Sequence, residues 1–181
     1  VEENNEEAFR WFSKAAEDDY PRAMCLLAEC YENGYGTQED MDKAVELYRR
    51  AHERGYVPAT CSLGLCYELG TGVEEDKARA VELYRQAAER GHARSQCNLG
   101  FCYYRGIGVA ENDDEAFKWF EKAAAQDYPR AIQLLGECYE NGYGVRKDVY
   151  QAAELYRKAH DRGSASGTCS LGLCYELGQG V

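Results

Sequence analysis

The sequence lacks long apolar runs and has too few basic residues to balance its acidic ones. Of its 181 residues, 21 are Lys or Arg and 32 are Asp or Glu, which gives a net charge of −11. This charge argues against nucleic acid or an anionic membrane as the main partner, because both attract cationic surfaces. No apolar segment approaches the roughly 20 residues that a membrane-spanning helix needs. We therefore expect neither nucleic-acid binding nor membrane insertion.

The sequence does not begin with methionine, and it ends within a repeated pattern. We therefore expect it to be a fragment of a longer chain. The absence of a signal peptide at Val1 then carries no information about the whole protein.

What the sequence does contain is a pattern that returns every 36 residues. The segment AECYENGYG at 28–36 returns as GLCYELGTG at 64–72, GFCYYRGIG at 100–108, GECYENGYG at 136–144 and GLCYELGQG at 172–180. A fixed period of this length is typical of stacked repeats, in which each repeat contacts only its neighbours. We expect one all-α solenoid domain over 1–181, with repeats at about 4–39, 40–75, 76–111, 112–147 and 148–181.

Each repeat carries signals for two helices joined by a tight turn. The first helix is expected to begin after a capping side chain, which is Asn4, Asp40, Asp76, Asn112 or Asp148. An apolar stripe at helical spacing follows the cap. A residue suited to left-handed backbone should end this helix, namely Asp19, Gly55, Gly91, Asp127 or Gly163. The second helix should end at a Gly-x-Gly segment.

A small residue inside each second helix predicts that another helix approaches closely there. It is Ala28, Gly64, Gly100, Gly136 or Gly172. Glycine in a helix interior costs about 1 kcal/mol relative to alanine, so a packing reason is expected.

Two consecutive motifs carry a resemblance to a known family. Ala-x-x-(Trp/Leu)-(Tyr/Phe)-x-x-Ala-(Ala/His) is followed in each repeat by Leu-(Gly/Ala)-x-Cys-Tyr-x-x-Gly-x-Gly. The pattern resembles the Sel1-like repeat, an α-helical relative of the tetratricopeptide repeats, over the whole chain. The resemblance implies a right-handed superhelix of helix pairs that acts as a non-catalytic adaptor in protein complexes.

The nine cysteines are expected to be unpaired. They are Cys25, Cys30, Cys61, Cys66, Cys97, Cys102, Cys138, Cys169 and Cys174. Two cysteines five residues apart on one helix have Cα atoms roughly 8.6 Å apart. A disulfide needs less than about 7 Å. Small buried side chains in a reducing compartment are therefore favoured, and with them a cytoplasmic location.

Catalytic and metal-binding interpretations have little support. The Gly-x-Gly segment follows a helix and lacks the Lys-Ser/Thr of a phosphate loop. The cysteine spacing is not that of a zinc knuckle. His52, His92 and His160 lie near the ends of first helices, and nothing provides an oxyanion hole or a third catalytic group. We expect no enzyme activity, no cofactor and no metal. An enzyme or metal protein built on the cysteines is the alternative.

One face of the first helices is the candidate binding groove, by analogy with tetratricopeptide arrays. An apolar strip beside charged groups there would suit an extended or helical peptide with some negative charge. The alternative is that the apolar members pack against the neighbouring repeat, as we expect for Trp11 and Trp119. The groove residues are Phe9, Val45, Arg49, His52, Val81, Arg85, Phe117, Glu121, Arg157 and His160.

The favoured function is a protein-interaction scaffold that binds a protein or peptide in this groove. The main alternative is a recruiting or regulatory segment of a larger enzyme or of a secretion or virulence factor. An apolar face at the end of the array also leads us to expect end-to-end self-association.

Overall fold

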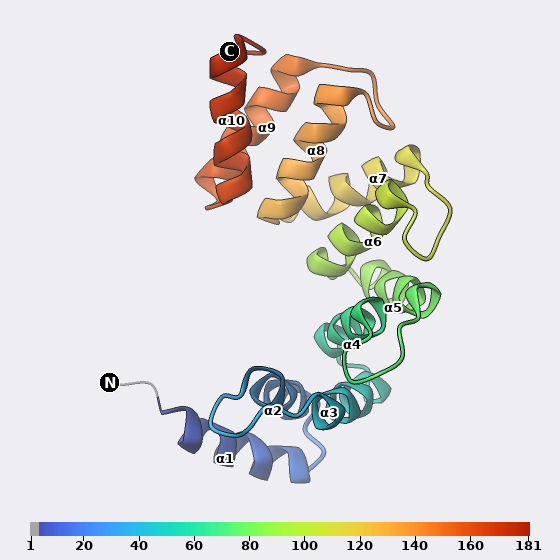
Figure 1. Ribbon diagram of the computed structural model, residues 1–181, viewed down its shortest axis with the longest axis vertical. Helices are drawn as coiled ribbons and strands as arrows, with labels where there is room; N and C mark the ends of the chain where they lie inside the picture. The colour runs from blue at the N-terminus through green and yellow to red at the C-terminus, as the bar shows by residue number, and fades with distance from the viewer. Residues whose placement is uncertain (1–3) are drawn as a thin grey trace. The chain divides into compact units, whose positions relative to one another are not determined.

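A computed structural model describes residues 4–181. These residues fold into ten α-helices and contain no β-strand, so the all-α prediction is confirmed. The helices, shown in Figure 1, are α1 (Asn5–Glu17), α2 (Pro21–Asn33), α3 (Met41–Glu53), α4 (Val57–Leu69), α5 (Lys77–Glu89), α6 (Ala93–Arg105), α7 (Asp113–Ala124), α8 (Pro129–Asn141), α9 (Val149–Asp161) and α10 (Ala165–Leu177).

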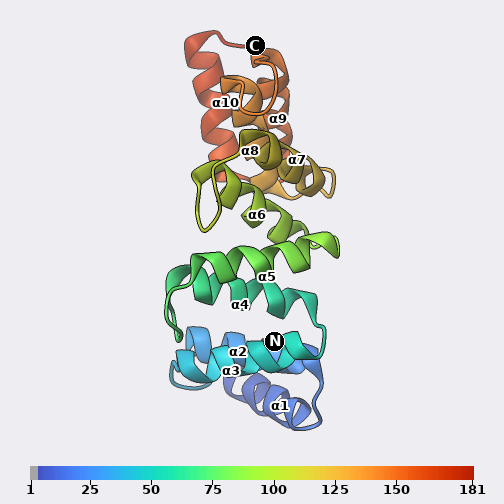
Figure 2. The ribbon, with the colours of Figure 1, turned by 90° about the vertical axis from the view of Figure 1, so that its right-hand side faces the viewer.

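The helices form two compact units. Unit 1 spans residues 1–90 and holds α1 to α5, and unit 2 spans residues 91–181 and holds α6 to α10. Within each unit every helix packs against the next one along the chain. In unit 1, for example, α4 and α5 lie side by side in both views (Figures 1 and 2). The second helix of a repeat packs more extensively on the first helix of the following repeat than on its own partner.

The first helices begin where the capping residues predict. Asn4 Oδ1 accepts a hydrogen bond of 3.0 Å from the amide of Glu7, which satisfies one of the orphan donors of the first turn. The other four caps, Asp40, Asp76, Asn112 and Asp148, make the same bond at 2.9 to 3.1 Å. The capping prediction is therefore confirmed in all five repeats.

The ends of the first helices are tied to the next repeat. Asp19 and Asp127 have φ values of 56° and 58°, a left-handed conformation that is unusual for residues other than glycine. Each of these aspartates forms ion pairs with two cationic side chains of the following repeat, one on its first helix and one at the C-terminal cap of that helix. Lys158 and Arg162 lie 2.9 and 2.7 Å from Asp127. Arg50 and Arg54 bind Asp19 in the same way. These pairs are largely exposed to solvent, so each adds little to the stability of the turn.

The step between repeats is built on a glycine and an aromatic ring. A Cβ added at Gly136 would lie 2.6 Å from Cε1 of Tyr156, and one added at Gly64 would lie 2.8 Å from Tyr84. Gly100 faces Phe120 in the same way. The predicted close approach is therefore confirmed at Gly64, Gly100 and Gly136, whereas at Gly172 it is wrong for the described residues, since a Cβ there would meet no atom within 4 Å.

The buried tyrosines of this step are anchored by glutamates of the preceding second helix. The hydroxyl of Tyr156 donates to Glu140 at 2.7 Å. The hydroxyls of Tyr48 and Tyr84 donate to Glu32 and Glu68, both at 2.6 Å. The step from α6 to α7 differs, because Phe120 has no hydroxyl and Tyr104 occupies the position of the glutamate.

The two tryptophans have different environments. Trp119 is 8% exposed and belongs to the core, as predicted. The prediction for Trp11 is wrong, since this side chain is 60% exposed. Trp11 lies on α1, which packs against α2 on one side and leaves the tryptophan on its outer surface.

Candidate functional site

The ten predicted groove residues differ in exposure. Val45 and Val81 are only 3% and 5% exposed. Phe9, His52, Arg85 and Phe117 are half-buried, and Arg49, Glu121, Arg157 and His160 are exposed.

The glycine loops explain why the apolar positions are covered. The second glycine of a Gly-x-Gly segment has a positive φ and folds back over the first helix of its own repeat. A Cβ at Gly72 would lie 2.9 Å from Cγ2 of Val45, and one at Gly144 would lie 2.9 Å from Cβ of Phe117. Val45 and Val81 therefore belong to the core. The two valines do not form an accessible strip, and the loop that covers Val45 belongs to its own repeat rather than to the neighbouring one.

A row of tyrosines on the second helices was not assigned to the site from the sequence. Tyr31 packs edge-to-face on Phe9 with ring centroids 5.4 Å apart, and Tyr139 packs on Phe117 at 5.6 Å. The signal was present, because this tyrosine recurs in every repeat. The structure places Tyr31, Tyr67 and Tyr139 in half-buried positions and Tyr175 in an exposed one.

The predicted arginines meet these tyrosines. Nη2 of Arg49 donates to the hydroxyl of Tyr67 at 3.4 Å in unit 1, and Nη2 of Arg157 donates to Tyr175 at 3.3 Å in unit 2. Both guanidinium groups are exposed, and neither forms an ion pair within residues 4–181. A guanidinium has five N–H donors in a planar fork that matches a carboxylate. Each Arg–Tyr pair therefore presents unused donors beside an aromatic ring.

His52 lines a cleft of about 350 Å³ in unit 1. Its Nδ1 lies 2.9 Å from the hydroxyl of Thr60, and Gln86, Glu89 and Arg90 complete the cleft. Burial, with the charge of Arg79 as a smaller cause, lowers the pKa of His52 below its ordinary value. At neutral pH this imidazole is therefore a neutral hydrogen-bonding group. His160 makes the equivalent contact with Thr168, also at 2.9 Å.

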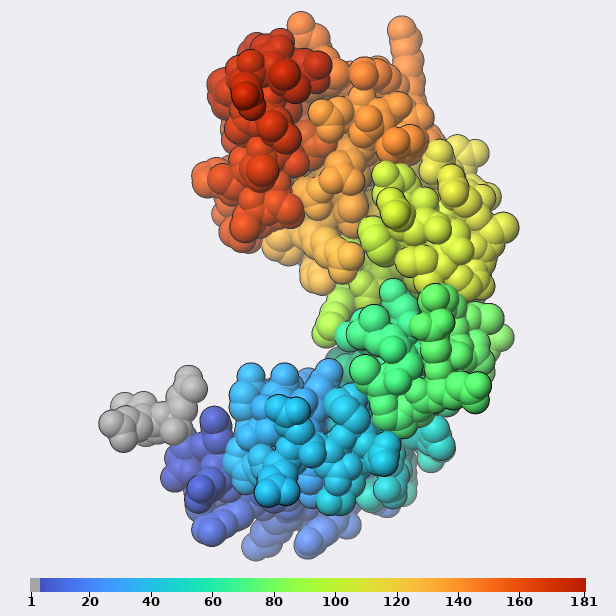
Figure 3. Space-filling model, in the orientation of Figure 1, coloured from blue at the N-terminus to red at the C-terminus, as the bar shows by residue number. Residues whose placement is uncertain are grey.

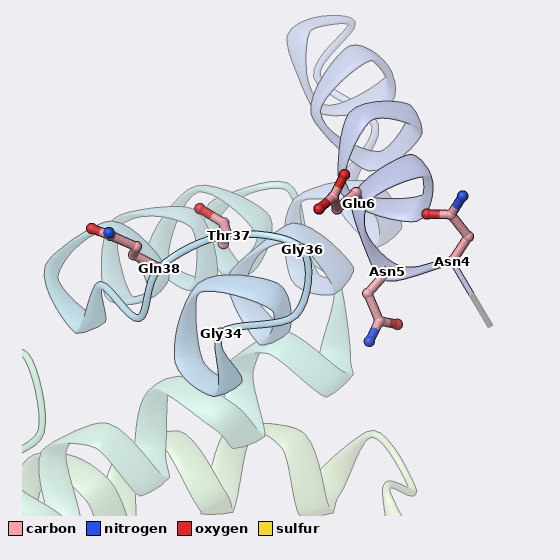
Figure 4. Close-up of a pocket in the computed structure, with 7 residues that line it drawn as sticks. All are labelled: Asn4, Asn5, Glu6, Gly34, Gly36, Thr37 and Gln38. Atoms are coloured by element: carbon pink, nitrogen blue, oxygen red, sulfur yellow. The ribbon is translucent and has the colours of Figure 1, made fainter.

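A second hollow, of about 850 Å³, lies at the start of α1. Figure 4 shows it between the Gly34–Gln38 stretch and the first residues of α1. Its lining is polar, and it includes none of the ten predicted groove residues. Gly36 packs closely on the start of α1, since a Cβ there would clash with the carbonyl group of Asn5.

The cysteines are packing residues. None of the nine cysteines forms a disulfide, and all except Cys169 are buried, as predicted for small apolar side chains. Burial raises the pKa of the Cys25 and Cys138 thiols to about 12 and that of Cys66 to about 11, so these groups are poor nucleophiles. Within residues 4–181, no group of three or more His, Cys, Asp or Glu side chains could hold a metal ion.

None of the helices in the described residues is both long and apolar enough to cross a membrane.

The comparisons with known proteins agree with the repeat pattern. The Sel1 repeat family matches residues 1–20, 21–56, 57–92, 93–128, 129–164 and 165–181. A full match such as 21–56 joins a second helix to the next first helix, which is the more extensively packed pair. No match was found among curated protein sequences.

Two solved structures are similar over nearly the whole chain. The first is c5321, described as a protective antigen of uropathogenic Escherichia coli strains with an SLR fold, at 38% identity and a TM-score of 0.87 over 96% of this chain. The chain spans only 37% of the length of that protein. The second is a Sel1 repeat protein from Oxalobacter formigenes, at 31% identity and a TM-score of 0.82, covering 97% of this chain and 74% of that one.

A third similar structure, the cysteine-rich protein B of Helicobacter pylori, has 28% identity and a TM-score of 0.57 over 70% of this chain and 96% of that one. The family pattern repeats from one end of the sequence to the other, and the helix pairs are those of its solved relatives. The chain therefore belongs to the Sel1 repeat family.

Proposed function

We propose that this chain is a non-catalytic scaffold that binds an acidic peptide segment of a partner protein through its Arg–Tyr pairs. Sel1 repeat proteins generally serve as protein-interaction scaffolds. The observation that carries the finer proposal is the recurrence of one contact in both units, Arg49 with Tyr67 and Arg157 with Tyr175. In a protein of net charge −11, exposed arginines without ion pairs favour an anionic ligand.

The contacts on this face define what the partner would need. Carboxylates would bind the guanidinium groups, and apolar side chains would contact the tyrosine rings beside them. The half-buried Phe9 and Phe117 add apolar surface at the edges of Tyr31 and Tyr139. Val45 and Val81 are buried, so substituting them would destabilise the fold and would not test binding.

The test is a comparison of two triple variants in quantitative affinity capture from the native lysate. The first carries Arg49→Gln, Arg85→Gln and Arg157→Gln. The matched control carries Arg22→Gln, Arg94→Gln and Arg146→Gln, which removes the same charge from exposed arginines elsewhere. Partners that bind the wild type and the control, but not the first variant, support the proposal.

The salt dependence of binding provides an independent check. Loss of the carboxylate-binding arginines Arg49 and Arg157 in this variant should flatten the dependence of affinity on salt concentration, since fewer ions are released on binding. Retention of every partner by the Arg49, Arg85 and Arg157 variant would refute this assignment.

The same binding role within a larger protein is a second proposal. The supporting observation is that the chain spans 37% of the length of the Escherichia coli antigen. Here the scaffold would recruit a partner for an activity located elsewhere in the chain. Deletion of these repeats from the parent protein should then remove the partner and leave that activity intact in isolation.

We also propose that residues 4–181, as an isolated fragment, associate end to end, with α10 taking the α1 helix of a second copy. A Cβ at Gly172 would meet no atom within 4 Å, whereas the equivalent glycines each face an aromatic ring. Residues 8–16 of α1 (AFRWFSKAA) nearly repeat residues 116–124 of α7 (AFKWFEKAA), the helix whose Phe120 packs on Gly100. Sedimentation should show concentration-dependent association that Gly172→Leu abolishes. A monomer at every concentration would contradict it.

A further inference from the structure

We propose that the end of α6, the start of α8 and the loop after α8 form a second docking surface, which binds an acidic peptide segment carrying a large apolar side chain. The surface consists of Phe101, Tyr104 and Arg105 on α6, Arg130 on α8 and Tyr143 in the following loop. It shares no residue with the Arg–Tyr pairs of the proposed function. Figure 3 shows the yellow-green end of α6 and its loop close to the orange segment of α8 and its loop.

Three aromatic rings form the centre of this surface. The ring centroids of Phe101 and Tyr104 are 6.3 Å apart, and those of Tyr104 and Tyr143 are 5.4 Å apart, with tilted planes. All three side chains are half-buried, so each keeps part of its ring accessible. Rings in contact at such distances support one another and present a rigid apolar area to a ligand.

Two arginines flank the rings. The guanidinium carbon of Arg130 lies 5.1 Å from the centroid of Phe101, and that of Arg105 lies 6.0 Å from the centroid of Tyr104. Both side chains are exposed, and neither forms an ion pair within the part of the chain that the structure describes. Stacking on a ring leaves the N–H donors at the edge of a guanidinium available to a carboxylate.

The surface departs from the repeat in a coordinated way. Residues 101, 104 and 105 share one face of α6, because positions three and four apart are neighbours on a helix. The same positions hold Glu, Glu and Asn on α2 and α8, and Leu, Glu and Leu on α4 and α10. Repeat packing thus accommodates polar and leucine side chains here, whereas α6 has aromatic and cationic ones.

On α6 Tyr104 stands where the other second helices have a glutamate, and the facing helix α7 has a matching replacement. Where the glutamate is present, a tyrosine hydroxyl of the next helix donates to it, as Tyr156 does to Glu140. On α7 this tyrosine is Phe120, which lines a crevice together with Tyr104 and Tyr143. Because Phe120 has no hydroxyl that needs an acceptor, any apolar residue at position 104 would be sufficient for packing. A tyrosine beside a phenylalanine and two arginines instead indicates a binding surface.

One acidic side chain borders the crevice. Glu137 accepts a hydrogen bond from Gln133, and burial raises the pKa of its carboxyl above the ordinary value. Its carboxylate is thus already engaged within α8, whereas Arg105 and Arg130 are not. The charge available to a ligand is therefore positive, although the whole chain carries −11.

These features specify the partner by its chemistry. Carboxylates suit the free edges of the two guanidiniums, and a Trp, Phe or Leu side chain suits the three rings. A nucleic acid could also stack on aromatic rings, but the two guanidinium groups do not form the extended positive groove that follows a nucleic-acid backbone. We therefore assign the surface to an acidic peptide segment of a protein.

The test begins with selection of random peptides of about 12 residues, displayed on phage, against the whole chain. Enriched peptides should carry several Asp or Glu residues around one large apolar residue. A synthetic, fluorescein-labelled copy of the most enriched peptide is then titrated against variants by fluorescence anisotropy. A labelled thymidine oligonucleotide of about 12 nucleotides is titrated as the competing ligand class.

The decisive variant rebuilds the repeat pattern on α6 and α7 with Phe101→Glu, Tyr104→Glu, Arg105→Asn and Phe120→Tyr. It copies the residues of α2 and α3, including the tyrosine–glutamate hydrogen bond, so the fold should be retained and is checked by circular dichroism. Peptide affinity should fall by at least about tenfold. Arg105→Gln with Arg130→Gln should weaken binding to a similar extent and flatten its salt dependence. Arg22→Gln with Arg94→Gln, which removes the same charge from exposed arginines elsewhere, is the matched control and should leave peptide affinity unchanged.

The outcomes separate this surface from the Arg–Tyr site. Arg49→Gln with Arg157→Gln should leave affinity for the selected peptide unchanged. Loss of affinity in that variant, with none in the rebuilt one, would place the peptide at the Arg–Tyr pairs and overturn this inference while supporting the proposed function. Failure to enrich acidic peptides, or tighter binding of the oligonucleotide, would also overturn it.

Discussion

Alanine substitutions at Gly136 and Gly172 should change stability in opposite directions. Both glycines occupy the same position of a second helix, and both lie in unit 2. An alanine in a helix interior is about 1 kcal/mol more favourable than a glycine, and this gain applies to both variants. A Cβ at position 172 meets no atom within 4 Å. Gly172→Ala should therefore stabilise unit 2 by about 0.5–1 kcal/mol.

At Gly136 the same substitution should lower the unfolding free energy, because the site is already filled. A Cβ there would lie 2.6, 2.8 and 3.2 Å from three ring atoms of Tyr156. That ring is fully buried, and its hydroxyl is held by Glu140 at 2.7 Å, so it cannot move without loss of a hydrogen bond. Overpacking of this kind costs about 1–3 kcal/mol, which leaves a net destabilisation of up to about 2 kcal/mol. Ala28 occupies this position in the first repeat with the Tyr48–Glu32 bond intact, which indicates a value in the lower half of that range.

The assay is urea unfolding followed by the fluorescence of Trp119, which is buried in unit 2. Trp11, exposed in unit 1, is replaced by Phe in every sample so that only unit 2 is reported. The two variants should differ by about 1–3 kcal/mol in unfolding free energy at an unchanged slope. Equal stabilisation by both alanines would show that the ring does not restrict Gly136, and the account of the step between repeats would fail.

Three further predictions concern single side chains. Near pH 8, iodoacetamide should modify Cys169 well before the eight buried thiols, and comparable rates in a peptide map would contradict their burial. His52 and His92 have lowered pKa values because of burial, so the folded state holds them neutral. Unfolding free energy should therefore fall as pH decreases through the unfolded value of 6.5, and His52→Gln with His92→Gln should reduce that slope. Tyr156→Phe should cost about 1–3 kcal/mol by leaving Glu140 without its donor, and a double-mutant cycle with Glu140→Gln should show the coupling.

The sequence predicted the local structure well because local rules determine it. The five capping residues, the left-handed Asp19 and Asp127, and the glycines that end each second helix are each specified by a few neighbouring residues. Because the same signals return every 36 residues, the same local structure was predicted for all five repeats. The close approach at Gly64, Gly100 and Gly136 was also predictable, since helix-interior glycine needs a packing reason.

The candidate site was less predictable because it depends on contacts distant in sequence. Val45 has the spacing of a groove residue, but the loop at Gly72 covers it, and helical periodicity contains no information about that loop. Trp11 and Trp119 have nearly identical flanking sequences and opposite exposure. Pairings such as Arg49 with Tyr67 join different helices, so they emerged only from the structure.

The glutamate, glycine and aromatic ring at each step also limit which repeats can be exchanged. Removal of residues 33–68 would bring Tyr84 opposite Glu32, and the junction would keep a donor and its acceptor. Removal of residues 105–140 would instead bring Tyr156 opposite Tyr104. The hydroxyl of Tyr156 would then lose Glu140 as its acceptor, and Tyr104 has no carboxylate to replace it. Although every repeat has the same length, the repeats therefore cannot all replace one another. Recombination or engineering at the junction of α6 and α7 must move both helices together.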